Sequence, residues 1–80
     1  MPTALRKNGY KFRYWCEEGN EHIHMHVYKG DGIAKIWLEP EIKWEYSKGF
    51  TVRERRDIER LINENFELLI NHWNEFFRQD

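Results

Sequence analysis

Apolar residues recur at steps of three and four from residue 52 to residue 78, and this amphipathic pattern restricts the fold more than any other feature of the chain. Side chains at these steps lie on one face of an α-helix. Thr51 and Glu54 have the spacing of a capping box, which marks where a helix begins. No Gly or Pro interrupts the segment, although its asparagines lower helix propensity and leave room for a bend. We predict one long helix over about residues 52–78, with an apolar face formed by Ile58, Leu61, Ile62, Phe66, Leu69, Trp73, Phe76 and Phe77.

The first half of the chain has the short patterns of β-strands. Asn8–Gly9 is a strong signal for a two-residue hairpin turn, because both residues tolerate positive φ. Pro40 ends the last clear strand pattern, and residues 41–50 fit either a short edge strand or an irregular segment. The predicted strands are residues 4–7, 10–16, 22–28 and 33–39.

Together these elements predict an α+β fold. It consists of an antiparallel sheet of about four strands, built from the β-hairpin and two further strands, followed by one long C-terminal amphipathic helix packed on one face. A chain of 80 residues is long enough for one small domain, residues 1–80, that buries about 60% of its unfolded surface. In its core we expect Leu61, Ile62, Leu69 and Trp73 to pack against Ile23, Met25 and Val27.

Composition excludes some classes of protein. The net charge of −1 lacks the strongly basic signature of many nucleic-acid-binding domains. Cys16 is the one cysteine, so no internal disulfide can form. The start does not resemble a signal peptide, and no run approaches the roughly 20 apolar residues of a membrane span. We therefore expect a soluble cytoplasmic protein that needs no membrane and no cofactor.

Three histidines alternate in the segment HIHMHV: His22, His24 and His26. On a strand they lie on one face, with neighbours about 6.5–7 Å apart, opposite an apolar set that faces the core. One interpretation is a half-exposed polar face without chemistry. A second is contact with a substrate or nucleic acid, and a third is metal ligation. One strand face supplies only part of a ligand set, so we expect no metal site and keep these histidines as weak metal candidates.

The same pattern occurs in histidine-triad nucleotide hydrolases, but their motif lies late in the chain and follows a glycine-rich loop. A different resemblance extends over nearly the whole sequence. The matching stretches include Gly9–Tyr10, Gly19–Asn20–Glu21, His24–Met25–His26–Val27, Trp37–Leu38–Glu39–Pro40, Gly49–Phe50 and Trp73–Asn74–Glu75. In these the chain resembles the small prokaryotic family called domain of unknown function 4160.

That family usually reads Glu-Pro-Pro-His-x-His-Val, so His22 stands where relatives have proline and His24 and His26 are the matching pair. The resemblance implies a place in toxin–antitoxin-like gene pairs, with a partner protein encoded nearby. It implies no reaction.

Further candidates share the histidine side of the sheet. If Ala34, Ile36 and Leu38 pack on the helix, their alternate neighbours Lys35, Trp37 and Glu39 lie beside the histidines. The candidate binding residues are therefore His24, His26, Lys35, Trp37, Glu39 and Arg13. Aromatic and basic residues on one open face suit single-stranded nucleic acid. A face from which water is excluded would suit a partner protein or a second copy of the chain, as in a homodimer.

Arg53 and Arg56 are candidates for phosphate contact, because a helix N-terminus also attracts anions. The alternative is a solvated helix face with local ion pairs, such as Asp57 with Arg53 or Arg60.

We expect a small binding module that acts with a partner protein, in a toxin–antitoxin-like or regulatory system, through the histidine-bearing sheet face. One alternative is nucleic-acid binding, or a ribonuclease-type enzyme with His24 and His26 as acid and base. Lys35 or Arg13 would then contact the phosphate, and Glu21 or Glu39 would supply a carboxylate. The second alternative is a metal-binding protein. On an exposed face, replacing both histidines of the matching pair by alanine should cost less than about 1 kcal/mol.

Overall fold

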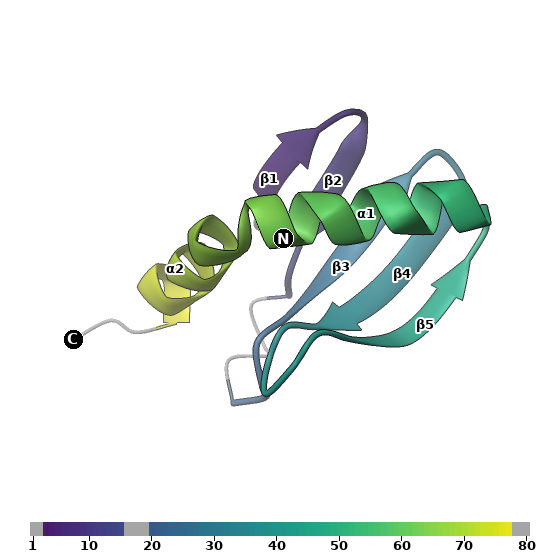
Figure 1. Cartoon of the computed structure of the whole chain (residues 1–80). Coiled ribbons are helices and arrows are strands. Elements are labelled where there is room, and N and C mark those ends of the chain that lie inside the picture. The colour runs from purple at the N-terminus through teal and green to yellow at the C-terminus, as the bar shows by residue number, and fades with distance from the viewer. Residues whose placement is uncertain (1–2, 16–19, 78–80) are drawn as a thin grey trace.

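The computed structural model describes residues 3–15 and 20–77, and it contains one antiparallel sheet and two helices (Figure 1). The five strands lie in the order β1-β2-β3-β4-β5, so each strand pairs with the next one along the chain. Helix α1 crosses one face of the sheet, and α2 lies beyond the β1 edge (Figure 1). The elements are β1 (Thr3–Lys7), β2 (Tyr10–Arg13), β3 (His24–Lys29), β4 (Gly32–Trp37), β5 (Lys43–Lys48), α1 (Val52–Glu64) and α2 (Phe66–Phe77).

The α+β class is confirmed, but the number of strands and the single helix were wrong. The ambiguous segment 41–50 contains the fifth strand, β5. The predicted long helix is divided at Asn65, whose side-chain amide donates to the Leu61 carbonyl at 2.8 Å. The Asn65 backbone N–H also donates to this carbonyl, at 3.0 Å, and its φ of −118° and ψ of 21° leave the helical region, so α1 ends here before α2 begins. The predicted positions of Cys16 and residue 78 lie outside the described residues.

The local signals at the turn and at the start of the helix are confirmed. Asn8 and Gly9 both have positive φ, 54° and 85°, as a tight hairpin turn between β1 and β2 requires. The capping box joins the Glu54 backbone N–H to the Thr51 hydroxyl at 3.1 Å. In return the Glu54 carboxylate accepts from the Thr51 backbone N–H at 2.9 Å. The cap fixes the point at which the chain leaves β5 and crosses the sheet as α1.

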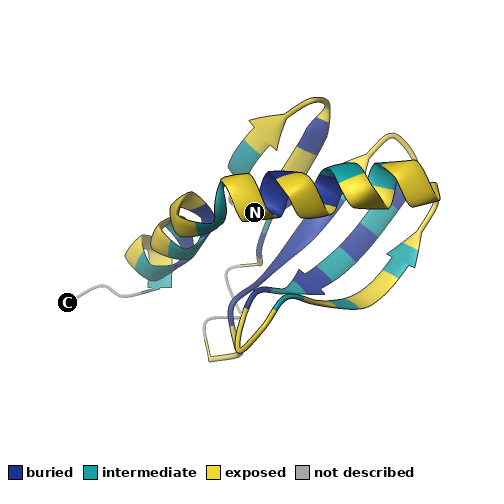
Figure 2. Ribbon diagram, viewed as in Figure 1, coloured by how far each residue is buried: buried dark blue, intermediate teal, exposed yellow. Residues whose placement is uncertain are grey.

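The core lies between the helices and one face of the sheet (Figure 2). Met25, Val27, Ala34 and Ile36 of β3 and β4 are fully buried. The predicted core set is confirmed, because Leu61, Ile62, Leu69, Trp73, Ile23, Met25 and Val27 are all buried in one cluster. Tyr10, Phe12 and Tyr14 add aromatic area to it. The opposite face of the sheet is not covered by α1 (Figure 1).

Within the described ranges, neither helix has the length and hydropathy that crossing a membrane requires.

Candidate functional site

The sheet face turned away from α1, which we call the open face, is defined by the strand register. Residues directly opposite one another in an antiparallel pair point to the same face. Trp44 lies opposite Ile36 and on the side of α1, because its indole N–H donates to Glu59 at 2.7 Å. The residues that the register places on the other side of the sheet form the open face. Its members are Arg6, Lys11, Arg13, His24, His26, Tyr28, Ile33, Lys35, Trp37, Lys43, Tyr46 and Lys48.

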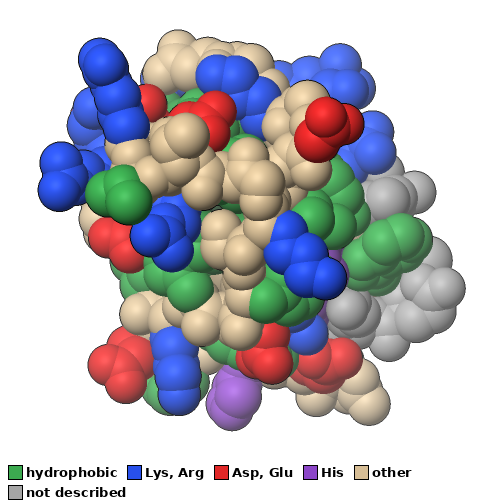
Figure 3. Space-filling view, turned by 90° about the vertical axis from the view of Figure 1, so that its right-hand side faces the viewer, with side chains coloured by type: hydrophobic (Ala, Val, Ile, Leu, Met, Phe, Trp, Pro, Cys, Tyr) green, Lys and Arg blue, Asp and Glu red, His purple; other side chains and the backbone are tan. Residues whose placement is uncertain are grey.

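Basic and aromatic side chains are interleaved on the open face. One row across the sheet runs Arg6, Lys11, Tyr28, Ile33 and Lys48, and the next runs Arg13, His26, Lys35 and Tyr46. Like charges directly opposite each other, as in the pair Arg6 and Lys11, cost stability. Figure 3 views the end of the molecule where α1 begins and shows Lys and Arg there among hydrophobic and acidic side chains. An anion lying on the open face would reduce this repulsion.

The histidine pair forms the buried floor of this face rather than its surface. His24 is 0% and His26 is 6% exposed. The His24 ring lies 4.8 Å from Trp37 and 5.1 Å from Trp73 between centroids, and the His26 ring lies 5.9 Å from Trp15. The expectation of exposed histidines was therefore wrong: Trp73 of α2 reaches the end of β3, and large aromatics cover both rings.

A backbone contact sets the tautomer of His24. Its Nδ1 lies 2.9 Å from the carbonyl oxygen of His22. A carbonyl only accepts hydrogen bonds, so Nδ1 carries the proton and donates. The neutral ring then has Nε2 as its acceptor nitrogen.

The other predicted face residues lie together beside the histidines. Register aligns Arg13, His26 and Lys35 across β2, β3 and β4. Lys35 Nζ lies 4.5 Å from the Trp37 ring centroid and 3.8 Å from a Glu21 carboxylate oxygen. Arg13 Nε donates to the Thr3 hydroxyl at 2.9 Å. Lys35 and Arg13 are thus held in place by neighbours within the sheet.

Glu39 lies away from the centre of the face, in a pocket beyond the end of β4. The pocket has a volume of about 260 Å³ and is lined by His22, Trp37, Glu39, Pro40, Glu41 and Lys43. The Glu39–Pro40 peptide bond is cis. Trp37 belongs both to this pocket and to the open face. Its indole N–H donates to Glu45 at 2.6 Å, which fixes the ring orientation.

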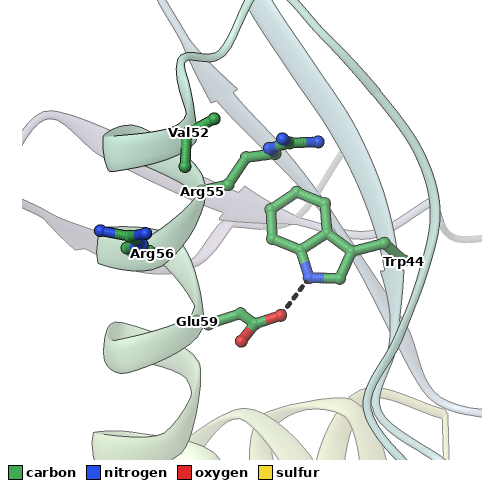
Figure 4. Close-up of a pocket in the computed structure, with 5 residues that line it drawn as sticks. All are labelled: Trp44, Val52, Arg55, Arg56 and Glu59. Atoms are coloured by element: carbon green, nitrogen blue, oxygen red, sulfur yellow. Dashed lines mark hydrogen bonds between the residues drawn. The ribbon is translucent and has the colours of Figure 1, made fainter.

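The arginines of α1 do not converge. A second pocket of about 270 Å³ lies between β5 and α1, lined by Trp44, Val52, Arg55, Arg56 and Glu59 (Figure 4). Arg55 extends beside the Trp44 ring, whereas Arg56 points away from it (Figure 4). Asp57 pairs with Arg60 at 3.5 Å. Arg60 is one of the two arginines that the ion-pair interpretation named as partners of Asp57. Of the two predicted phosphate contacts, Arg56 lines this pocket and Arg53 is not among its lining residues.

In the part of the chain that the structure describes, no three His, Cys, Asp or Glu side chains lie close enough to hold a metal ion together. His22 is exposed just before β3, outside the buried pair.

Sequence reasoning missed the contribution of β5 to the open face. Tyr46 lies opposite Lys35 and is 39% exposed, and Lys48 lies opposite Ile33. The alternation in residues 43–48 was the available signal. It is weak because an edge strand with polar residues on both sides looks like a loop. A shift of register between Lys35 and Ile36 also brings Glu45 to the Trp37 indole.

Tyr14 connects the base of the sheet to α2. Its hydroxyl lies 2.7 Å from Nδ1 of His72, and its ring lies 5.3 Å from Trp73. Burial raises the pKa of Tyr14 to about 12, because a phenolate is poorly solvated in this position. The hydroxyl therefore stays protonated near neutral pH.

The fold and the open face define a small α+β domain with a meandering five-stranded sheet followed by two helices. The family model of the Domain of unknown function (DUF4160) matches residues 9–74, and the chain belongs to this family. The match extends from the turn before β2 into α2 and includes the histidine pair, Lys35 and Trp37. Searches of curated proteins and of solved structures gave no match.

Proposed function

We propose that this chain is a small binding module that holds single-stranded nucleic acid on its open face. The observation that carries the proposal is the register, which aligns Lys and Arg side chains from β1, β2, β4 and β5 with Tyr28, Trp37 and Tyr46 on the face turned away from α1. Single-stranded nucleic acid needs this combination, because cations follow the phosphates while aromatic rings stack on the bases.

The cations are available for phosphate contact. Lys11 and Lys48 are exposed, and no carboxylate among residues 3–15 and 20–77 pairs with either of them. They flank Tyr28 and Ile33 in one row across the sheet. A chain of phosphates along this row would release counterions, so its affinity should fall steeply with salt. The net charge of −1 for the whole protein does not oppose this, because charge on one face determines the local potential.

The aromatic side chains offer stacking surface. Tyr46 is 39% exposed, and Tyr28 and Trp37 are half-buried. Stacking of one base on one such ring contributes about 1–3 kcal/mol. The glutamate that holds the Trp37 indole keeps this ring in a fixed orientation and reduces the entropy lost on binding.

Burial of the histidine pair favours binding over acid–base catalysis. A general acid or base must come within hydrogen-bond distance of the reacting group. His24 and His26 are buried beneath aromatic rings, and His24 Nδ1 already donates to the backbone. Their role in this proposal is to support Trp37 and Lys35 from below.

A partner protein with an acidic surface is the second candidate. It is the role that the resemblance to the family implied, through toxin–antitoxin-like gene pairs, and the same row of cations supports it. Nucleic acid is preferred because bases explain the aromatic residues as well as the charge.

The test is fluorescence anisotropy with a labelled single-stranded RNA of mixed sequence, titrated at several salt concentrations. We expect micromolar binding at low salt, with log affinity falling by about 0.7 per phosphate contact for each unit of log salt. The double variant Lys11→Gln, Lys48→Gln should bind at least fivefold more weakly and show a shallower slope.

The matched control is Lys7→Gln with Arg53→Gln, which removes equal charge from exposed residues outside the open face. It should bind almost as the natural chain does. No binding at low salt, or equal loss in both double variants, would count against the open face as a nucleic-acid surface. Binding of an acidic polypeptide instead, at the same lysines, would favour the second candidate.

A further inference from the structure

The pocket beyond the end of β4 continues the open face. Trp37 and Lys43 lie opposite each other on the open face and both line the pocket. Its volume of about 260 Å³ lies below the roughly 300–1,000 Å³ of pockets for drug-sized ligands and suits one small planar group. A strand of nucleic acid that crosses the open face past Trp37 therefore reaches this pocket next.

The lining combines groups of opposite charge in a definite arrangement along the chain. Glu39 and Glu41 flank Pro40, and Lys43 follows at the start of β5. Glu39 and Glu41 are exposed, and within the described ranges neither carboxylate is used by a hydrogen bond or an ion pair. Carboxylates repel phosphate, so the glutamates cannot serve the backbone of a nucleic acid. They can accept hydrogen bonds from the edge of a base.

We propose that this pocket receives one base of the bound strand and selects bases that carry an exocyclic amino group. This inference rests on the proposed function. A base would stack against Trp37, with the Lys43 ammonium near the adjoining phosphate. Its amino group would donate to Glu39 or Glu41, which is the pairing by which acidic side chains read cytosine N4.

A comparison of cytosine with uracil shows which contact would make the pocket selective for one base. At the position of the cytosine amino group uracil has a carbonyl oxygen, which is an acceptor and would face a carboxylate that is also an acceptor. Cytosine, adenine and guanine each present an amino group, whereas uracil and thymine present none. The ring N3–H of uracil is a donor at a different position on this edge, so a carboxylate placed at the exocyclic group prefers cytosine to uracil, two bases of the same size.

The experiment compares short labelled oligocytidine and oligouridine strands of equal length by anisotropy at neutral pH. We expect the natural chain to bind oligocytidine about five- to tenfold more tightly, within the discrimination of one specific base contact. In the double variant Glu39→Gln, Glu41→Gln we expect the ratio to fall below twofold. An electrostatic effect alone would change both affinities together and leave the ratio as it was.

The control variant is Glu64→Gln with Glu67→Gln, exposed residues around the break between the helices, which changes the net charge equally. It should keep the preference for oligocytidine. Equal binding of the two strands by the natural chain, or a preference that survives in the Glu39 and Glu41 variant, would overturn the pocket assignment while leaving the open face intact. If neither strand binds the natural chain, the proposed function itself fails.

Discussion

Trp73 of α2 lies against His24 of β3, with their ring centroids 5.1 Å apart. In the sequence β4, β5 and α1 lie between these two residues. This contact joins the C-terminal helix to the floor of the open face. His24 in turn lies 4.8 Å from Trp37, so the three rings connect α2 to the surface at which we propose that bases stack. The stability of the domain and the shape of the open face therefore depend on the same histidine.

Replacing His24 by Ala should destabilise the domain. The side chain is 0% exposed and packed among aromatic rings, and its removal leaves a cavity and a backbone carbonyl without its donor. We expect a loss of about 2–4 kcal/mol in the free energy of unfolding, measured by urea denaturation. The exposed His22 is the control, and His22→Ala should change stability by less than about 0.5 kcal/mol. Equal, small effects at both positions would show that His24 is not part of the core.

Leu69 of α2 provides the corresponding test of how the helix faces the sheet. It is 0% exposed, whereas its neighbour Leu68 is 46% exposed. Leu69→Ala should cost about 2–5 kcal/mol. Leu68→Ala should cost much less, because it removes a side chain that is already largely in solvent. A reversed order in denaturant titration would mean that α2 is rotated about its axis.

Gly32 at the start of β4 should not tolerate a side chain. A Cβ there would lie within 2.3 Å of the Phe50 ring, which packs on this glycine just before α1. We expect Gly32→Ala to cost about 1–3 kcal/mol through overpacking. In the background of Phe50→Ala the same change should cost far less, because the ring is gone. Additive costs in this double-mutant cycle would contradict the contact.

Stability should fall at alkaline pH because of Tyr14. Its pKa is raised by burial from 10.0 to about 12, so the unfolded chain releases this proton at a lower pH than the folded chain does. The contribution is complete below pH 10 and is lost as the pH rises through the folded value near 12. We expect a decrease on the order of 1–2 kcal/mol from Tyr14 over this window. In Tyr14→Phe the decrease over the same pH range should be smaller by that amount, in urea denaturation followed by circular dichroism.

Local signals predicted much of the fold. The Asn8–Gly9 turn and the capping box at Thr51 each act within a few residues, so they could be recognised without the tertiary structure. The helix is divided at Asn65 by a local change of the backbone, φ −118° and ψ 21°, and propensity alone cannot distinguish this from a continuous helix. The sequence left residues 41–50 open between an edge strand and an irregular segment, because β5 is mostly exposed at the sheet edge, where the alternation that marks a half-buried strand is weak.

The sequence predicted which residues share the candidate site, but it did not predict how deeply they are buried. Strand alternation was enough to group His24, His26, Lys35 and Trp37 on one face. Their exposure depends on what covers them, and the covering groups include Trp73 from the other end of the chain. A pattern with a period of two residues carries no information about such distant contacts.

The most direct test of the open face compares the indole N–H signals of Trp37 and Trp44 in two-dimensional NMR spectra. Both indoles donate to a glutamate, but Trp37 lies on the open face and Trp44 lies on the side of α1. During titration with a short single-stranded RNA at low salt, the Trp37 signal should shift together with backbone signals of Lys11, Tyr46 and Lys48, while the Trp44 signal stays in place. Shifts centred on Trp44 and α1, or no shifts at either indole, would contradict the claim that the open face binds nucleic acid.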